Sequence, residues 1–267
     1  MKQSCRLFTG KSAKHKRHSR ILRWFAAGLF VLLLTAVISA VICQSYIQVK
    51  SYTIKLSGLD QPVRLAMIAD LHGLEFGPEN ERLVRKMAEQ QPAAIFLAGD
   101  MVNRDGDRSE VDRLIHLIHE FENIAPVYFS PGNHENDYMK RDPSLLDRIA
   151  ESGANVVNDS FLDVGIGGQL FRIGGTTGHA FPFGRDEEAF EQSPEYRFLR
   201  EFEQAQWPKI CLAHLPDTFI FNGAYSLWDV DLVLSGHTHG GVIRLPLLGG
   251  LYAPMQGFFP EYDQSKP

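Results

Sequence analysis

The sequence predicts an α/β domain in which strands and helices alternate along the chain. Short apolar runs, typical of strands covered on both faces, are separated by segments whose apolar residues recur at helical spacing. Polar side chains follow several of these runs directly. Because the ends of parallel strands meet along one edge of a sheet, we expect these side chains to converge there. With 267 residues, 44% hydrophobic and 22% charged, the chain is long enough for a domain with an ample core.

The expected elements are assigned from the period of the apolar residues. A glycine-rich stretch at 164–175 lacks the lysine and the helix of a phosphate-binding loop and predicts a hairpin. Helices are expected at 79–91, 112–121, 144–151 and about 187–205. Strands are expected at 52–56, 63–69, 93–98, 126–129, 210–213, 231–234 and 242–244.

Residues 24–43 form a run of 20 residues without a charge. At 1.5 Å per residue, a helix of this length crosses a hydrocarbon core of about 30 Å. The run exceeds the apolar stretch of about 7–15 residues in a cleaved signal peptide. The large Val37 and Ile38 also stand at the −3 position of the best cleavage sites. We therefore favour an uncleaved transmembrane anchor over a cleaved signal peptide.

The flanks of this run predict its orientation. Residues 1–23 carry eight of the 27 basic residues and no acidic one. The positive-inside rule places this basic arm in the cytoplasm and the rest of the chain outside, in a single-pass protein of the cell membrane. The expected organisation is an arm at 1–23, an anchor at 24–43, a linker at 44–50 and a catalytic domain at 51–267.

The net charge of the chain limits the classes of binding partner that we expect, and the positions of its cysteines limit the disulfides that we expect. The remaining 19 basic residues face 32 acidic ones, so residues 24–267 carry a net charge of −13. Such an acidic body argues against nucleic-acid binding through a basic surface. Cys5, Cys43 and Cys211 lie in unrelated settings, so no disulfide and no zinc finger are expected.

Five short polar signatures follow predicted strands. Carboxylate oxygens combined with imidazole nitrogens suit Mn, Fe, Zn or Co. A glycine precedes three of the polar residues and permits the close backbone approach of a tight site. The signatures are Asp70-Leu71-His72, Gly99-Asp100, Gly132-Asn133-His134-Glu135, His214 and Gly236-His237-Thr238-His239.

The order of these signatures resembles that of the calcineurin-like metallophosphoesterases, over roughly residues 50–267. Their membrane-anchored bacterial phosphodiesterases are most similar, because of the apolar run and the sequence GHTHGGVIRLP. The resemblance implies a four-layer α-β-β-α sandwich of two mixed sheets flanked by helices. It also implies two divalent metal ions, Mn, Fe or Zn. The family continues through further strands, so strands that complete the second sheet are expected to be missing here.

The resemblance assigns a role to each signature residue. A hydroxide bridging the ions would attack phosphorus, while His134 would stabilise the transition state and protonate the leaving oxygen. Many relatives have an acid three residues after Asp100; here Asn103 is expected to accept the His134 N–H through its amide oxygen. Asp70, His72 and His239 would hold the first ion, Asn133, His214 and His237 the second, and Asp100 would bridge them.

Other polar residues are assigned with alternatives. His179 and Arg185, in the loop 177–186, could flank the substrate, with the arginine suited to phosphate. The equal alternative is an ordinary loop anchored by its aromatic residues. Glu135 either orients neighbouring groups or caps the following turn. His116 and His119 are expected to be surface or packing residues.

The expected function is metal-dependent phosphoester hydrolysis, of diesters more than monoesters, on the outer side of the cytoplasmic membrane. Lipid-linked phosphates and soluble nucleotides are both candidate substrates. No protein or nucleic-acid partner is expected, and the acidic body disfavours a nuclease. The alternative is a truncated, metal-binding but inactive membrane protein.

Overall fold

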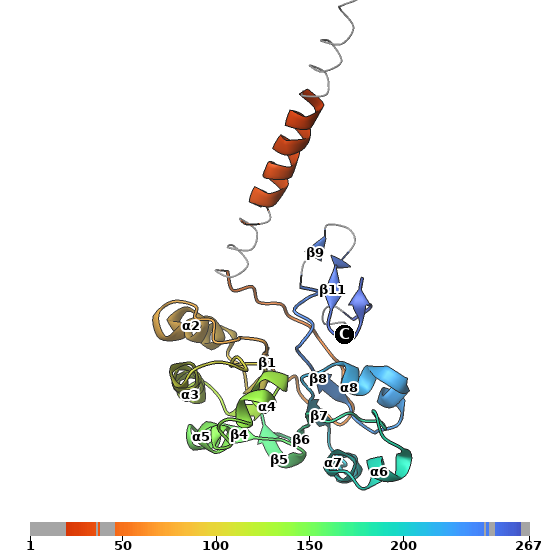
Figure 1. Ribbon diagram of the computed structural model, residues 1–267. Helices are drawn as coiled ribbons and strands as arrows, with labels where there is room; N and C mark the ends of the chain where they lie inside the picture. Colours follow the sequence, from red (N-terminus) through yellow and green to blue (C-terminus); the bar gives the residue numbers. More distant parts are fainter. Residues whose placement is uncertain (1–19, 36, 38–45, 243, 246–248, 263–267) are drawn as a thin grey trace, which may run out of the picture. The chain divides into compact units, whose positions relative to one another are not determined.

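The computed structural model describes residues 20–35, 37, 46–242, 244–245 and 249–262. The chain forms two compact units, Met1–Lys50 and Ser51–Pro267. In the first unit, residues 20–35 are helical with exposed side chains (Figure 1). Within the described ranges, no helix combines the length and the apolarity needed to span a bilayer. The anchor at 24–43 stays a prediction, because residues 36 and 38–43 lie outside the described residues, as do residues 1–19 of the basic arm.

The first sheet of the second unit is built from parallel strands in the order β1-β2-β3-β4. Helices connect the strands and cover one face of the sheet (Figure 1). The strands are β1 (Leu65–Ile68), β2 (Ala94–Ala98), β3 (Val127–Ser130) and β4 (Asn155–Val156). The helical segments are η1 (Pro78–Asn80), α2 (Glu81–Gln90), α3 (Arg108–Glu122), α4 (Asn133–Met139) and α5 (Leu145–Glu151).

The second sheet has the order β5-β6-β7-β8 and is mixed, because β5 runs antiparallel to β6. β5 (Ser160–Ile166) and β6 (Gln169–Gly175) form the hairpin predicted at 164–175, and β7 (Lys209–Leu212) and β8 (Leu232–Leu234) complete the sheet. Its outer face carries α6 (Glu187–Glu191), α7 (Pro194–Phe202), α8 (Asp217–Ile220) and η2 (Phe221–Ser226).

Two apolar clusters hold these layers together. Side chains from both sheets, including Phe96, Tyr128 and Phe171, are buried between the sheets. A second cluster, which includes Phe198 and Phe202, lies between the second sheet and its helices. This confirms the α/β fold with sheets flanked by helices. Among the described residues only the second of these sheets is mixed, however; in the first, helical crossovers join successive strands, and all three pairings are parallel.

Two predicted elements are wrong in detail. Residues 52–56 form no strand: they lack a pairing partner among the described residues, and Tyr52 and Ile54 are exposed. The helix predicted at 187–205 is broken into α6 and α7. Ser193 accepts the Tyr196 N–H with its hydroxyl and begins a new helix, and Pro194 follows at its first position, where no donor is needed.

Beyond β8 the chain forms two small hairpins instead of one strand at 242–244. Residue 243 lies outside the described residues. β9 (Arg244–Leu245) pairs with β10 (Gly249–Gly250), and β11 (Tyr252–Ala253) pairs with β12 (Gly257–Phe258).

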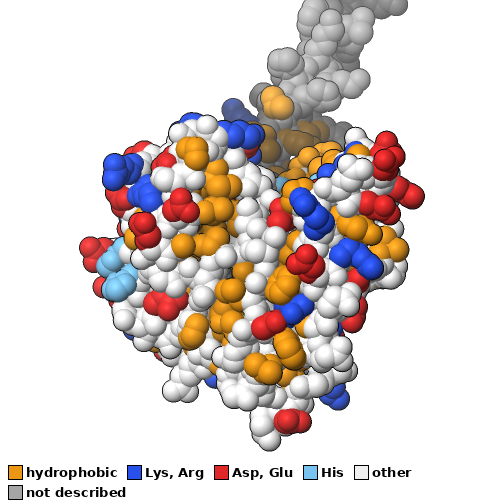
Figure 2. Space-filling model, turned by 90° about the horizontal axis from the view of Figure 1, so that it is seen from below, with side chains coloured by type: hydrophobic (Ala, Val, Ile, Leu, Met, Phe, Trp, Pro, Cys, Tyr) orange, Lys and Arg blue, Asp and Glu red, His pale blue; other side chains and the backbone are white. Residues whose placement is uncertain are grey.

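On the face of the molecule seen in Figure 2, basic and acidic side chains are interspersed rather than gathered into patches of one sign.

Candidate metal centre

The five polar signatures stand where β1, β2, β3, β7 and β8 end, and backbone hydrogen bonds join the loops that carry them. The Asp70 N–H donates to the Gly99 oxygen and the His72 N–H to the Asp100 oxygen, both at 3.0 Å. On the other sheet, the Gly236 N–H donates to the His214 oxygen at 3.0 Å. The ends of the two sheets therefore present their polar side chains to one site.

Asp70, His72 and His239 form a first group. One possible ligand atom of each lies within 4.8 Å of those of the other two. The Nε2 atoms of His72 and His239 are 3.9 and 3.7 Å from Asp70 Oδ1, and the two rings stack with centroids 5.1 Å apart. Two imidazoles and a carboxylate thus face a common point that a divalent ion would fit.

Asp100, His214 and His237 form a second group within the same distance limit. His214 Nε2 lies 3.1 Å from Asp100 Oδ2, without the alignment of a hydrogen bond. Asp100 Oδ2 is also 3.9 Å from His72 Nε2 of the first group, so one carboxylate faces both groups. Asn133 begins α4 beside them, and its Oδ1 is buried without a hydrogen-bond partner.

His134 lies against this pair of groups. Its Nε2 is 3.9 Å from Asp100 Oδ2, and its backbone N–H donates to Asp100 Oδ1 at 2.8 Å. The Arg104 backbone N–H donates to His134 Nδ1 at 3.2 Å, and the Arg104 guanidinium lies 3.1 Å from Nε2.

Asn103 was expected to accept the His134 ring N–H, but that prediction is wrong. Its amide nitrogen donates to the His72 backbone oxygen at 2.8 Å, which ties the loops after β1 and β2 together.

The backbone at the proposed ligands is strained. Non-glycine residues rarely adopt positive φ, which costs roughly 1–2 kcal/mol per residue, and such residues cluster at functional sites. The surrounding hydrogen bonds hold these residues in that conformation. Five of the seven proposed metal ligands have φ between 48° and 69°: Asp70, His72, Asp100, His237 and His239.

Two of the glycines permit contacts that a side chain would block. A Cβ on Gly236 would lie 2.6 Å from Asp70 Oδ2, and a Cβ on Gly132 would overlap Asp100 Oδ1. In the gap beside Gly236, both Asp70 oxygens accept the His237 N–H, at 3.0 and 2.8 Å. The glycines therefore let backbone approach the carboxylates that face the site.

Glu135 organises the backbone around Asp100. Its buried carboxylate accepts four backbone N–H groups at 2.7–3.1 Å, those of Asp100, Met101, Val102 and Gly132. Burial raises the pKa of Glu135, and the N–H donors oppose this by stabilising the charged form. Of the two alternatives that the sequence left open, the structure shows both at once: the side chain caps α4 through Gly132 and orients the loop after β2.

The electrostatics of the site favour bound cations. Burial lowers the pKa of His72 and, together with His214, lowers the pKa of His237 to about 4. Burial also opposes protonation of His214, but the carboxylates of Asp100 and Asp70 raise its pKa. The buried atoms His72 Nε2, His214 Nε2 and Asn133 Oδ1 have no hydrogen-bond partner. Carboxylate, imidazole and amide donors with these free lone pairs fit a pair of divalent transition-metal ions.

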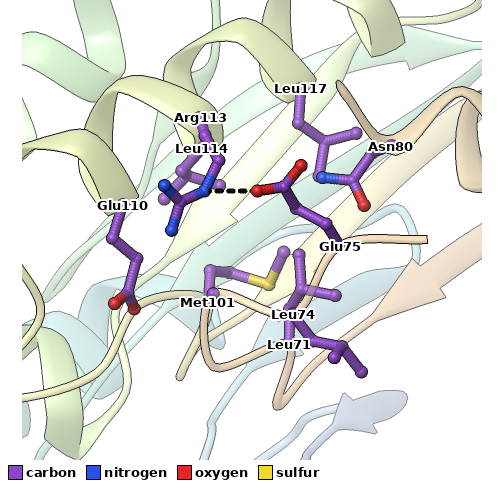
Figure 3. Close-up of a pocket in the computed structure, with 10 residues that line it drawn as sticks. Leu71, Leu74, Glu75, Asn80, Met101, Glu110, Arg113, Leu114 and Leu117 are labelled. Atoms are coloured by element: carbon purple, nitrogen blue, oxygen red, sulfur yellow. Dashed lines mark ion pairs between the residues drawn. The ribbon is translucent and has the colours of Figure 1, made fainter. Parts of the chain in front are cut away.

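A small pocket behind the loop after β1 shows how this loop is held (Figure 3). The Arg113 Nε atom pairs with the Glu75 carboxylate at 2.9 Å. Glu110, also from α3, accepts the Asn103 backbone N–H and fixes the start of the segment that carries Arg104. The pocket has a volume of about 10 Å³, room for no more than one water molecule. Arg104 and Glu110 were missed in the sequence because no motif marks them.

The loop 177–186 contacts its own aromatic residues and α7. The His179 ring stacks on Phe183 with centroids 4.1 Å apart. The Arg185 guanidinium pairs with Glu195 and lies over the Phe190 ring. Neither His179 nor Arg185 belongs to the groups of possible metal ligands found among the described residues. These contacts favour the aromatic-anchored loop, and the role of both residues in substrate binding stays a prediction.

The chain is similar to several known proteins. The family model described as calcineurin-like phosphoesterase matches residues 63–241. The uncharacterized metallophosphoesterase Cj0846 of Campylobacter jejuni is 27% identical over 199 residues, covering 73% of this chain and 49% of the relative. The phosphodiesterase YaeI of Escherichia coli is 26% identical over 198 residues, covering 73% of this chain and 67% of YaeI. Among solved structures, TT1561 of Thermus thermophilus matches with a TM-score of 0.45 at 17% identity, covering 65% of this chain and 81% of that one. The chain thus spans about half the length of the Campylobacter relative.

Proposed function

This chain belongs to the calcineurin-like phosphoesterases, and from that premise we propose that it hydrolyses phosphodiesters in preference to monoesters, with two divalent metal ions at the strand ends. The position of Asp100 carries this proposal, because its Oδ2 faces His214 Nε2 at 3.1 Å and His72 Nε2 at 3.9 Å. A carboxylate between two imidazole groups suits a bridging ligand. The preference for diesters is supported by the Escherichia coli relative, which is named a phosphodiesterase.

The proposed ligands are Asp70, His72 and His239 for one ion and Asn133, His214 and His237 for the other, with Asp100 shared. Bound divalent ions supply Lewis-acid chemistry, which activates water and neutralises phosphoryl charge. The chain's contribution is a rigid arrangement of donors, because Glu135 and the hydrogen bonds to Asp70 fix the loops that carry them.

His134 and Arg104 would act on the substrate. Because His134 Nδ1 accepts the Arg104 N–H, the proton of the neutral ring lies on Nε2, where it can donate a hydrogen bond to a phosphoryl or leaving oxygen; protonation of the leaving oxygen would require the imidazolium form. The Arg104 guanidinium, 3.1 Å from Nε2, is a second donor facing the same space. A phosphoryl oxygen beside both groups would accept from both, which stabilises the developing charge.

We extend the proposal to the location of the reaction. The uncharged run at 24–43 would anchor the chain in the cytoplasmic membrane, and the basic arm at 1–23 would keep the amino terminus inside. The catalytic domain would then act on the outer side, on lipid-linked or soluble phosphoesters.

The hydrolysis of an aryl phosphodiester and of the matching monoester by the full chain tests this function. The assay is run without added metal and with Mn, Zn or Fe, beside His134→Ala and Asp100→Asn. The matched control is His116→Ala, an exposed histidine on α3. We expect metal-dependent turnover, with the diester preferred, that the control keeps and both site variants lose. A folded, metal-loaded protein without turnover would identify an inactive metal-binding protein instead.

A further inference from the structure

One side of α4 contacts the loop 103–106, which carries Arg104. Arg104 is the cation that lies 3.1 Å from His134 Nε2, so the residues that hold it decide which charges a substrate meets there. Four residues on this side of α4 and of the turn that follows it are spaced by three and four positions, as neighbours on a helix surface are. The four are His134, Asp137, Tyr138 and Arg141.

Arg141 fixes the backbone of this loop. Its guanidinium donates to the Arg104 carbonyl oxygen and, at 3.4 Å, to the Gly106 oxygen. The same guanidinium lies over the ring of the buried Tyr138, 4.8 Å from the ring centroid. The Arg104 N–H, in turn, donates to His134 Nδ1. Both backbone polar groups of Arg104 are thus tied to α4 and its following turn, which limits the positions that the Arg104 side chain can reach.

Asp137 holds the guanidinium of Arg104. One of its carboxylate oxygens lies 3.6 Å from Arg104 Nη1, and the other accepts from Lys140 Nζ at 2.6 Å. Lys140 and, to a smaller extent, Arg104 lower the pKa of Asp137, so the carboxylate is charged at neutral pH. The Arg104 side chain is 56% exposed and that of Asp137 36%, so a bound ligand can reach both. A negative charge therefore stands beside the cation that faces the phosphoryl group.

Phosphomonoesters and phosphodiesters differ in the charge that they bring to this place. A monoester is close to doubly charged above its second pKa of about 6, whereas a diester has no second proton to lose and carries a single charge. A carboxylate beside the site repels the doubly charged group more strongly than the singly charged one. A repulsive charge in a fixed position is a general means of selecting between two similar ligands.

We propose that Asp137 is a specificity-determining residue, whose charge beside Arg104 disfavours doubly charged phosphomonoesters at the metal centre. Arg141 is the positioning residue that keeps Arg104 next to this carboxylate. Lys140 moderates the selection, because it shares the carboxylate with Arg104. This inference rests on the proposed function, and it gives the preference for diesters a physical cause in the charge of the substrate.

Two phosphonates that differ by one charge test the selection without catalysis. At pH 8, phenylphosphonate is close to doubly charged, and methyl phenylphosphonate is singly charged. Their dissociation constants are measured by isothermal titration calorimetry on the full chain, in detergent and loaded with Mn or Zn. The variants are Asp137→Asn and Lys140→Gln, and the second tests the same ion pair from its other side if the first fails to fold. The matched control is Asp147→Asn, which removes one negative charge from an exposed position on α5.

We expect Asp137→Asn to strengthen the binding of phenylphosphonate relative to its methyl ester by about fivefold, and Lys140→Gln to weaken it relative to the ester. The monoester-to-diester ratio of kcat/KM should shift in the same directions, while Asp147→Asn leaves both ratios within about twofold of the wild type.

Two results would overturn the proposal. One is a ratio of dissociation constants in Asp137→Asn that equals the wild-type ratio. The other is a folded, metal-loaded wild type that binds neither phosphonate. Because binding needs no catalysis, a shifted ratio in a chain that turns over neither ester would support the selection by Asp137 and contradict the hydrolysis proposed above.

Discussion

The Nδ1 atom of His214 lies 2.8 Å from the carbonyl oxygen of Ala98, the last residue of β2. The carbonyl accepts the Nδ1 proton and leaves the Nε2 lone pair, 3.1 Å from Asp100 Oδ2, available to a metal ion that Asp100 would share. The contact also joins the two sheets, because His214 follows β7. Packing between the sheets and ligand orientation at the metal centre therefore depend on the same hydrogen bond.

Glu135→Gln is expected to destabilise the fold although it preserves the shape of the side chain. Each carboxylate oxygen accepts two backbone N–H groups, and the NH₂ of glutamine would place a donor against one of these pairs. We expect the free energy of unfolding to fall by about 2–4 kcal/mol, measured by urea unfolding of the metal-free protein. The control is the exposed Glu151→Gln, and equal stability of the two variants would contradict the role given to Glu135.

Arg104→Ala is expected to weaken catalysis without loss of stability, since the side chain is 56% exposed. Loss of a charged donor to the phosphoryl group should lower kcat/KM about 100-fold. Arg104→Lys should recover part of this loss, because it keeps the charge but not the planar fork. Steady-state kinetics beside Arg85→Ala, an exposed arginine on α2, provide the comparison. If both alanine variants keep wild-type kinetics, Arg104 does not contact the substrate.

Asp163→Asn is expected to lower stability wherever the carboxyl is ionised and to lose this effect in acid. Both oxygens of Asp163 accept from Arg172 at 2.7 Å, and this pairing holds the pKa of the carboxyl below its usual 3.8. The contribution to folding is therefore complete above about pH 3.8 and is lost as pH falls through the lower pKa of the folded state. Asp163 is 37% exposed, so we expect only about 1 kcal/mol at pH 7. Urea unfolding between pH 7 and pH 3 measures this, and a difference that persists undiminished at pH 3 refutes it.

Cys211 is expected to resist thiol reagents in the folded protein. Burial raises the pKa of its thiol, and the thiolate is the reactive form. In the Cys5→Ser/Cys43→Ser variant at pH 8, the labelling rate should be at least 100-fold lower than in urea. Comparable rates would show that the centre of the second sheet opens readily.

The spacing of apolar residues along the chain predicted much of the fold. Buried strands and amphipathic helices each have a characteristic spacing, and the tertiary contacts bury the face that this spacing produces. The spans 93–98 and 112–121 lie within or close to β2 and α3 for this reason. The segment 52–56 has the alternation of a strand, but alternation needs a neighbouring strand to bury one face, and the sequence does not reveal that neighbour. The break at Ser193 was visible in principle, since Ser-Pro begins a new helix.

At the site, strand-end motifs predicted which residues meet, because parallel strands end at a common edge. The partner of His134 was not predictable from spacing. Asn103 and Arg104 are adjacent in the sequence. The backbone conformation of the loop after Asp100 decides which of the two contacts the His134 ring. The four hydrogen bonds that Glu135 accepts were likewise not predictable from the sequence. They depend on three consecutive backbone N–H groups after β2 that all point at the Glu135 carboxylate.

The number of metal ions bound per chain decides whether the site holds a metal pair that shares Asp100. The full chain is loaded with Mn or Zn, freed of excess metal and analysed by native mass spectrometry beside Asp100→Ala and His116→Ala. We expect two ions in the wild type and in His116→Ala, and weakened binding of both ions when the shared carboxylate is removed. A folded wild-type protein that binds one ion or none, or two ions unaffected by Asp100→Ala, would contradict a metal pair centred on Asp100.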